Sequence, residues 1–124
     1  MSGADIQFFF TMRDQIKLYH WHTHSYARHK ATDETIDALD KTIDEYVETY
    51  MGKYGRSRVG PTTSAIKLSN LSEKGIVRFI KDCIDHLQGA LVKRLDPAKD
   101  TDLINLRDEM LGDLNKILYL FSLH

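Results

Sequence analysis

The sequence predicts an all-α protein that folds as a four-helix bundle. Four stretches of the 124-residue chain carry apolar residues at helical spacing, and no stretch alternates convincingly as a β-strand does. The two prolines, Pro61 and Pro97, lie outside the long periodic stretches, which leaves room for long helices. Because a chain of this length holds one core, we expect residues 1–124 to form a single domain.

The first two helices are predicted over residues 4–27 and 32–51. Thr32 is predicted as the N-cap of the second helix, and Asp33 and Glu34 suit the positive end of its dipole. The apolar stripe of the first helix consists of Ile6, Phe9, Met12, Ile16, Tyr19 and Thr23. The stripe of the second helix consists of Ile36, Leu39, Ile43, Tyr46, Val47 and Tyr50.

The third helix is predicted to begin near Ser72, and the fourth between Asp96 and Thr101. The third stripe consists of Ile76, Ile80, Cys83, Ile84, Leu87 and Leu91. The fourth consists of Leu103, Leu106, Met110, Leu114, Ile117, Leu118 and Phe121. Cys83 is the only cysteine, so the chain cannot form an internal disulfide, and its place on an apolar stripe indicates inert packing.

The connection between the second and third helices, "GKYGRSRVGPTTSAIKLSN" (residues 52–70), is long for a helical bundle. We expect such a loop to cross over the bundle, to cover an interface or to move. Lys53, Arg56 and Arg58 surround the aromatic Tyr54, a combination that also occurs in proteins that bind single-stranded nucleic acid. No larger basic surface accompanies them, so we interpret the loop as solvated and expect no nucleic-acid partner.

The net charge of −1 gives no general attraction to nucleic acid or to an anionic membrane. The apolar start of the chain is too short, and too soon interrupted by charge, for a signal peptide or a membrane span. We therefore expect a cytoplasmic protein with no membrane partner. The single cysteine fits a reducing compartment.

Four of the six histidines lie in residues 17–33, "KLYHWHTHSYARHKATD". A neutral imidazole offers a nitrogen to a metal ion at physiological pH. His20 shares a helix face with Ile16 and is predicted to point inward, either as a metal ligand or as a core histidine bonded to a neighbour. His22 is predicted to face solvent, and His24 fits either environment.

Two pairs of polar residues stand one helical turn apart in the second helix. His29 and Asp33 form the first pair, which fits two ligands of one metal, a carboxylate that orients an imidazole, or a simple N-terminal cap. Asp44 and Glu48 form the second, within a row of acidic residues beside the apolar stripe. Carboxylates with imidazoles and no thiolate suit Fe, Mn or Zn.

The two pairs cannot reach one ion from a single straight helix. Asp33 and Asp44 are separated by about 16 Å along the helix axis at 1.5 Å per residue. If two copies pack this helix antiparallel across a two-fold axis, however, the imidazoles of one copy face the carboxylates of the other. Such a dimer would carry two composite metal sites.

The pattern "YHWH…RHKATD…D…E" resembles the DNA-protection-during-starvation (Dps) mini-ferritins. The specific part of the match is a His-x-x-x-Asp step, an Asp eleven residues later and a Glu four residues after that. The matching residues are His20, Trp21, His29, Asp33, Asp44 and Glu48. The last predicted helix is also similar to that of the family, with aromatic and leucine residues near a terminal histidine, His124.

This resemblance implies a ferritin-like four-helix bundle that oxidises Fe(II) with O₂ or H₂O₂ at a site between subunits. It places His20, His29 and Asp33 on one subunit and Asp44 and Glu48 on its mate. Iron is the expected metal, with Zn or Mn as further possibilities. The expected assembly is a homo-oligomer of at least two copies, and the family forms dodecamers.

The alternative is a catalytically silent bundle of the same fold that acts as an interaction or assembly protein. The sequence contains no Glu-x-x-His step of the kind that places a di-iron centre inside one bundle, which makes a metal centre within a single copy the weaker hypothesis. Asp82 and His86 on the third helix are expected to form an isolated surface pair.

Overall fold

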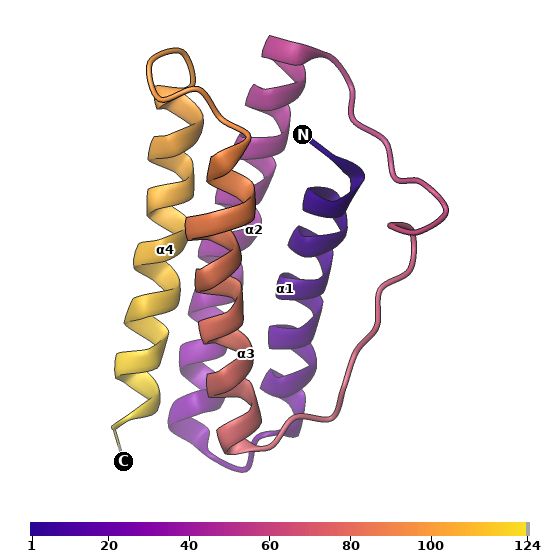
Figure 1. Cartoon of the computed structure of the whole chain (residues 1–124). Helices are drawn as coiled ribbons and strands as arrows, with labels where there is room; N and C mark the ends of the chain where they lie inside the picture. Colours follow the sequence, from indigo (N-terminus) through magenta and orange to yellow (C-terminus); the bar gives the residue numbers. More distant parts are fainter. Residues whose placement is uncertain (124) are drawn as a thin grey trace.

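The computed structural model of the chain describes residues 1–123, which form four α-helices and one short π-helical segment. The elements are α1 (Gly3–His22), α2 (Tyr26–Tyr54), α3 (Glu73–His86), η1 (Leu87–Leu91) and α4 (Thr101–Phe121). No β-strand occurs in this described part of the chain, and the four α-helices lie side by side (Figure 1). The predicted all-α class is therefore confirmed. His124 lies outside the described residues.

The helices do not simply alternate in direction. α1 and α4 run one way and α2 and α3 run the other way, so the connection between α2 and α3 returns from one end of the bundle to the other (Figure 1). This connection, residues 55–72, lies beside α1. The Gln15 side chain holds it there, since its amide donates to the Ser69 carbonyl at 2.8 Å and its oxygen accepts the Ser69 N–H at 2.9 Å.

The turn between α1 and α2 lies earlier in the chain than the sequence predicted. α1 ends at His22, and Ser25 is the N-cap of α2, with its hydroxyl accepting a hydrogen bond from the Arg28 N–H at 3.2 Å. Thr32, the predicted cap, is instead buried inside α2, where its hydroxyl donates to the Arg28 carbonyl one turn back. Thr23, predicted on the apolar stripe, is the C-cap of α1.

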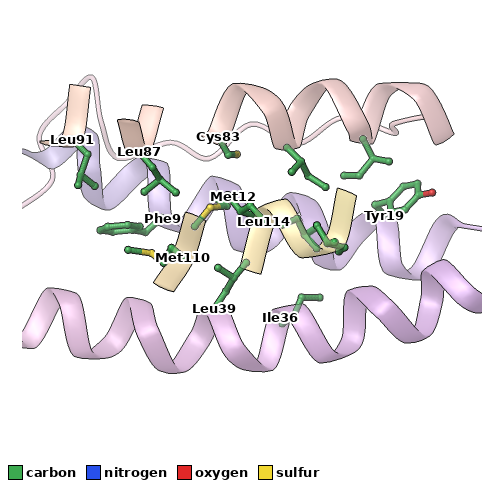
Figure 2. Packing of buried hydrophobic residues seen from close by; sticks show 14 of the residues in the cluster. Phe9, Met12, Tyr19, Ile36, Leu39, Cys83, Leu87, Leu91, Met110 and Leu114 are labelled. Atoms are coloured by element: carbon green, nitrogen blue, oxygen red, sulfur yellow. The ribbon is translucent and has the colours of Figure 1, made fainter. Parts of the chain in front are cut away.

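The predicted apolar stripes meet in one core between the helices (Figure 2). Each fully buried aliphatic or aromatic side chain stabilises the fold by about 1.5–3 kcal/mol. The buried apolar members of the four stripes are Phe9, Met12, Ile16, Tyr19, Ile36, Leu39, Tyr46, Ile76, Ile80, Cys83, Leu87, Leu91, Leu103, Met110, Leu114, Ile117 and Phe121. Burial raises the pKa of the Cys83 thiol to about 12, so it stays protonated and packs as an apolar group, as predicted.

Two residues assigned to the loop from the sequence belong to the last turn of α2. The Lys53 ammonium lies 3.0 Å from a carboxylate oxygen of Asp100 and 2.9 Å from one of Asp102, and the Tyr54 hydroxyl donates to Asp100. These contacts join the end of α2 to the start of α4. Lys53 is therefore paired with carboxylates, and the loop begins only after Tyr54.

His86 also differs from its prediction. It does not form an isolated surface pair with Asp82, which lies 3.7 Å from Arg78 instead. The His86 ring stacks on Phe8 with 3.9 Å between ring centroids, and its Nε2 atom lies 3.3 Å from the buried carboxylate of Asp5. This contact links the end of α3 to the first turn of α1, a long-range pairing that the local spacing of α3 cannot indicate.

Candidate functional site

The best candidate site lies where α1 ends and α2 begins. His20 is in the last turn of α1 and His29 is in the first turns of α2, so the reversal of the chain brings the two imidazoles face to face. Their ring centroids are 3.8 Å apart, and the ring planes are inclined by 17°. His20 is buried, as predicted, whereas His29 is exposed. We call this pair the histidine clasp.

Reciprocal bonds to the main chain fix the orientation of both rings. The Nδ1 atom of His20 lies 2.8 Å from the carbonyl oxygen of His29, and the Nδ1 atom of His29 lies 2.9 Å from the carbonyl oxygen of His20. A carbonyl oxygen can only accept a hydrogen bond, so each Nδ1 carries a hydrogen and donates. In the neutral form, each Nε2 therefore keeps its lone pair and is the ring nitrogen that remains free to bind a metal ion.

The sequence explains why these acceptors are available. The carbonyl groups in the last turn of a helix have no partner within the helix, and the carbonyl of His20 belongs to the last turn of α1. His29 therefore satisfies one of these groups. The carbonyl of His29 lies inside α2, where its second lone pair remains available after the helical hydrogen bond.

Arg28 fastens this end of the bundle. Its guanidinium donates to the Tyr19 hydroxyl of α1 at 3.0 Å, to the Glu73 carbonyl of α3 at 3.0 Å and to the Phe121 carbonyl of α4 at 3.2 Å. The planar, multivalent guanidinium suits such a junction, which an ammonium group could not reproduce. The clasp is thus built on a turn that is anchored to all the other helices.

The other predicted site residues lie along the exposed side of α2. Asp33 follows His29 by one turn, and Asp44 and Glu48 lie further along the helix; all three carboxylates are exposed. Within residues 1–123, no group of three or more histidine, cysteine, aspartate or glutamate side chains is close enough to hold a metal ion. One copy brings together only the two histidines and leaves the three carboxylates apart from them.

A groove of about 640 Å³ lies between α1 and α2, and Asp44 contributes to its lining. Arg13 bridges it, with its Nε 3.0 Å from a carboxylate oxygen of Asp40. The apolar side chains of the groove are Ile6, Phe9, Phe10, Ile43, Val47 and Met51. The predicted carboxylate pair therefore begins at the edge of an apolar depression in the surface.

The remaining histidines of the cluster take no part in the clasp. His22 is exposed, as predicted, and His24 lies in the turn between the helices, also exposed. The residue that the sequence reasoning missed is Thr32, whose hydroxyl oxygen lies 2.8 Å from the Nδ1 atom of His20. Its position three residues after His29 on a helix was a usable signal, but the expected helix start at Thr32 obscured it.

Residues 20–121 match a protein family described as a family of unknown function, DUF5856. This match covers the clasp and α2 to α4, and the chain belongs to this family. The chain is also similar to the "Uncharacterized 14.6 kDa protein in mobD-ri intergenic region" of Enterobacteria phage T4. The two are 32% identical over 104 residues, which is 84% of this chain and 74% of the phage protein.

No solved structure matches the chain. Among residues 1–123, no helix is both long enough and apolar enough to cross a membrane.

Proposed function

We propose that this chain is a ferritin-like, Dps-like protein that oxidises Fe(II) at a site shared between two copies. The histidine clasp carries the proposal, because its hydrogen bonds hold two imidazoles with Nε2 as the metal-binding atom. In the proposed site, His20, His29 and Asp33 come from one copy. Asp44 and Glu48 come from the other.

The order of helix directions supports the ferritin-like assignment. Ferritin-like bundles have one long crossover connection, between the second and third helices, and residues 55–72 make such a connection here. An alternating up-down bundle with short loops would speak against it.

Two features of α2 support a site that needs a second copy. The clasp and the Asp44–Glu48 pair lie too far apart along α2 for one ion, at about 1.5 Å of rise per residue. The groove between α1 and α2 exposes apolar side chains beside Asp44, among them Phe10, which is 55% exposed. A second copy packed antiparallel on this face would cover the groove and bring its own imidazoles to these carboxylates.

The ligand chemistry suits Fe(II), because imidazole and carboxylate ligands without thiolate favour iron, manganese or zinc. In the proposed reaction, two Fe(II) ions each give one electron to one molecule of hydrogen peroxide, which takes up two protons and leaves as two molecules of water. With dioxygen, four Fe(II) ions supply the electrons, and four protons are taken up to give two waters. The single thiol, buried and protonated, fits the reducing cytoplasm that we propose as its location.

The proposal is tested by following the absorbance of Fe(III) after hydrogen peroxide is added to the protein with Fe(II). We expect the parent chain to exceed the protein-free rate. Asp44→Ala and Glu48→Ala should fall close to the protein-free rate, because each removes a ligand from the composite site. Asp37→Ala is the matched control, since Asp37 is also exposed on α2 but is not one of the proposed ligands. Equal rates for the parent, the variants and the protein-free solution would refute the proposal.

The second candidate is a catalytically silent bundle that acts as an interaction or assembly protein. The observation that favours it is the apolar groove between α1 and α2, together with the lack of a three-ligand group within residues 1–123 of one copy. Self-association of the chain that is unaffected by Asp44→Ala, without any Fe(II) oxidation, would support this candidate over the first.

A further inference from the structure

Thr32 contacts the buried member of the histidine clasp. His20 is 6% exposed, and its Nδ1 atom has two partners at 2.8 Å, the His29 carbonyl oxygen and the Thr32 hydroxyl oxygen. Thr32 itself is 0% exposed. Water therefore has no access to replace the hydroxyl if it is removed.

The Thr32 hydroxyl has only one hydrogen, and its surroundings determine where that hydrogen goes. Its oxygen lies 2.8 Å from the carbonyl oxygen of Arg28 and 2.9 Å from that of His29. Both carbonyls can only accept, so the hydroxyl shares its one hydrogen between them. Its lone pairs are left to accept from the His20 Nδ1–H, in agreement with the tautomer that the His29 carbonyl imposes.

We infer that Thr32 is a positioning residue that, together with the His29 carbonyl, holds the His20 ring in one orientation for metal binding. This inference rests on the proposed function, because it concerns the same site. The His20 Nδ1–H has two acceptors, the Thr32 hydroxyl and the His29 carbonyl. The Thr32 hydroxyl also donates to the His29 carbonyl, and this hydrogen bond restrains the carbonyl. Without the Thr32 hydroxyl, the buried Nδ1–H keeps only the His29 carbonyl as an acceptor, and the ring is held less firmly in its orientation.

Three variants of the full chain separate this role from general packing. Thr32→Val keeps the shape of the side chain and removes the hydroxyl, whereas Thr32→Ser keeps the hydroxyl. Thr42→Val is the matched control, because Thr42 is also buried in α2 and its hydroxyl donates to the Ala38 carbonyl at 3.1 Å, four residues back on the same helix.

The first measurement is the ¹⁵N chemical shifts of the histidine ring nitrogens in the metal-free protein. In the parent, we expect both His20 and His29 to show the pattern of a single Nδ1–H tautomer. In Thr32→Val, the tautomer should persist because the His29 carbonyl remains, but the His20 Nδ1 signal should shift and broaden, because this N–H has lost one of its two acceptors. Thr32→Ser and Thr42→Val should retain the parent pattern. Unchanged His20 signals in Thr32→Val would overturn the inference.

The second measurement is the affinity for Co(II), a spectroscopic substitute for Fe(II). Loss of a hydrogen-bond partner behind a metal-binding histidine weakens metal binding by about 10- to 100-fold. We expect a weakening near the lower limit for Thr32→Val, because the His29 carbonyl remains, and parent-like affinity for Thr32→Ser and Thr42→Val. Equal affinity of Thr32→Val and the parent would overturn the inference. If the parent binds no Co(II), the proposed function fails, while the ring-nitrogen measurement still decides the role of Thr32.

Discussion

Among single residues, Asp100 shows how a buried charge is used to join elements. Its carboxylate precedes α4, accepts hydrogen bonds from the Tyr54 hydroxyl and the Asp96 N–H, and lies 3.0 Å from the Lys53 ammonium. These contacts hold the pKa of Asp100 at about 2, with the Tyr54 hydrogen bond as the largest cause. A carboxylate whose pKa is lowered by folding stabilises the folded state only while it is charged.

The pH dependence of stability follows from the lowered pKa of Asp100. The stabilisation by Asp100 should be fully present above about pH 4 and should disappear as the pH falls toward the folded-state pKa of about 2. We expect Asp100→Asn to lower the melting temperature at pH 7 and the difference from the parent to shrink below pH 4. The measurement is thermal unfolding of the parent and Asp100→Asn from about pH 2 to pH 7. Asp85→Asn is the control, because Asp85 is exposed. A difference that persists unchanged at pH 2 would contradict the assignment.

The candidate site was only partly predictable at this scale. Helical spacing predicted that His20 points inward, and it does. Spacing could not show that His20 and His29 stack, because that contact depends on a turn at residues 23–25 that the sequence reasoning placed too late. The same error turned Thr32 from a buried partner of His20 into an expected helix cap.

Among the elements, the crossover segment of residues 55–72 is unusual because it is a long connection without a helix. Two glutamines of α1, Gln7 and Gln15, make hydrogen bonds to it. Gln15 is 3% exposed and makes two bonds to Ser69, whereas Gln7 makes one bond, to the Ala65 carbonyl at 2.7 Å. A buried amide that satisfies both its donor and its acceptor on one residue is a strong local anchor.

Removing that anchor should release the segment. Gln15→Ala leaves the Ser69 main-chain groups without their partner, so we expect it to lower the free energy of unfolding by about 2 kcal/mol. Cleavage by trypsin after Arg56, Arg58 and Lys67 should become faster, because the protease needs a locally detached chain. Gln7→Ala, which removes a single exposed bond, is the control and should change both quantities less. Equal cleavage rates for Gln15→Ala and the parent would show that the segment is held by other contacts.

The helices illustrate what periodicity can and cannot predict. The apolar stripes identified most core-facing residues of the four helices, since the 3.6-residue period directly reports one buried side. Ala31 was missed, whereas Ile6 lines the groove and Thr23 caps α1. The start of α3 was also predicted near Ser72, which is its N-cap, with the Ser72 hydroxyl accepting the Gly75 N–H at 3.0 Å. Helix direction is different, because a stripe is equally buried whichever way its helix runs. Only the length of the connection between α2 and α3 pointed to the parallel arrangement of these two helices.

For the whole molecule, we propose that each metal site takes ligands from two copies. The clasp supplies imidazoles at one end of α2, and the Asp44–Glu48 pair lies further along the same helix. In such a composite site, a defect in the imidazoles and a defect in the carboxylates can be carried by different chains. Two inactive variants can then restore one another when they share a dimer.

The most direct test therefore mixes two variants, His20→Ala and the double variant Asp44→Ala/Glu48→Ala, in equal amounts with exchange of subunits. In a mixed dimer, one site would lack His20, Asp44 and Glu48, and the other site would have all of its ligands. If subunits pair at random, half of the dimers are mixed, and we predict recovery of about a quarter of the parent rate of Fe(II) oxidation. A mixture that stays as inactive as its two components, while the parent is active and the subunits are shown to exchange, would contradict the shared site.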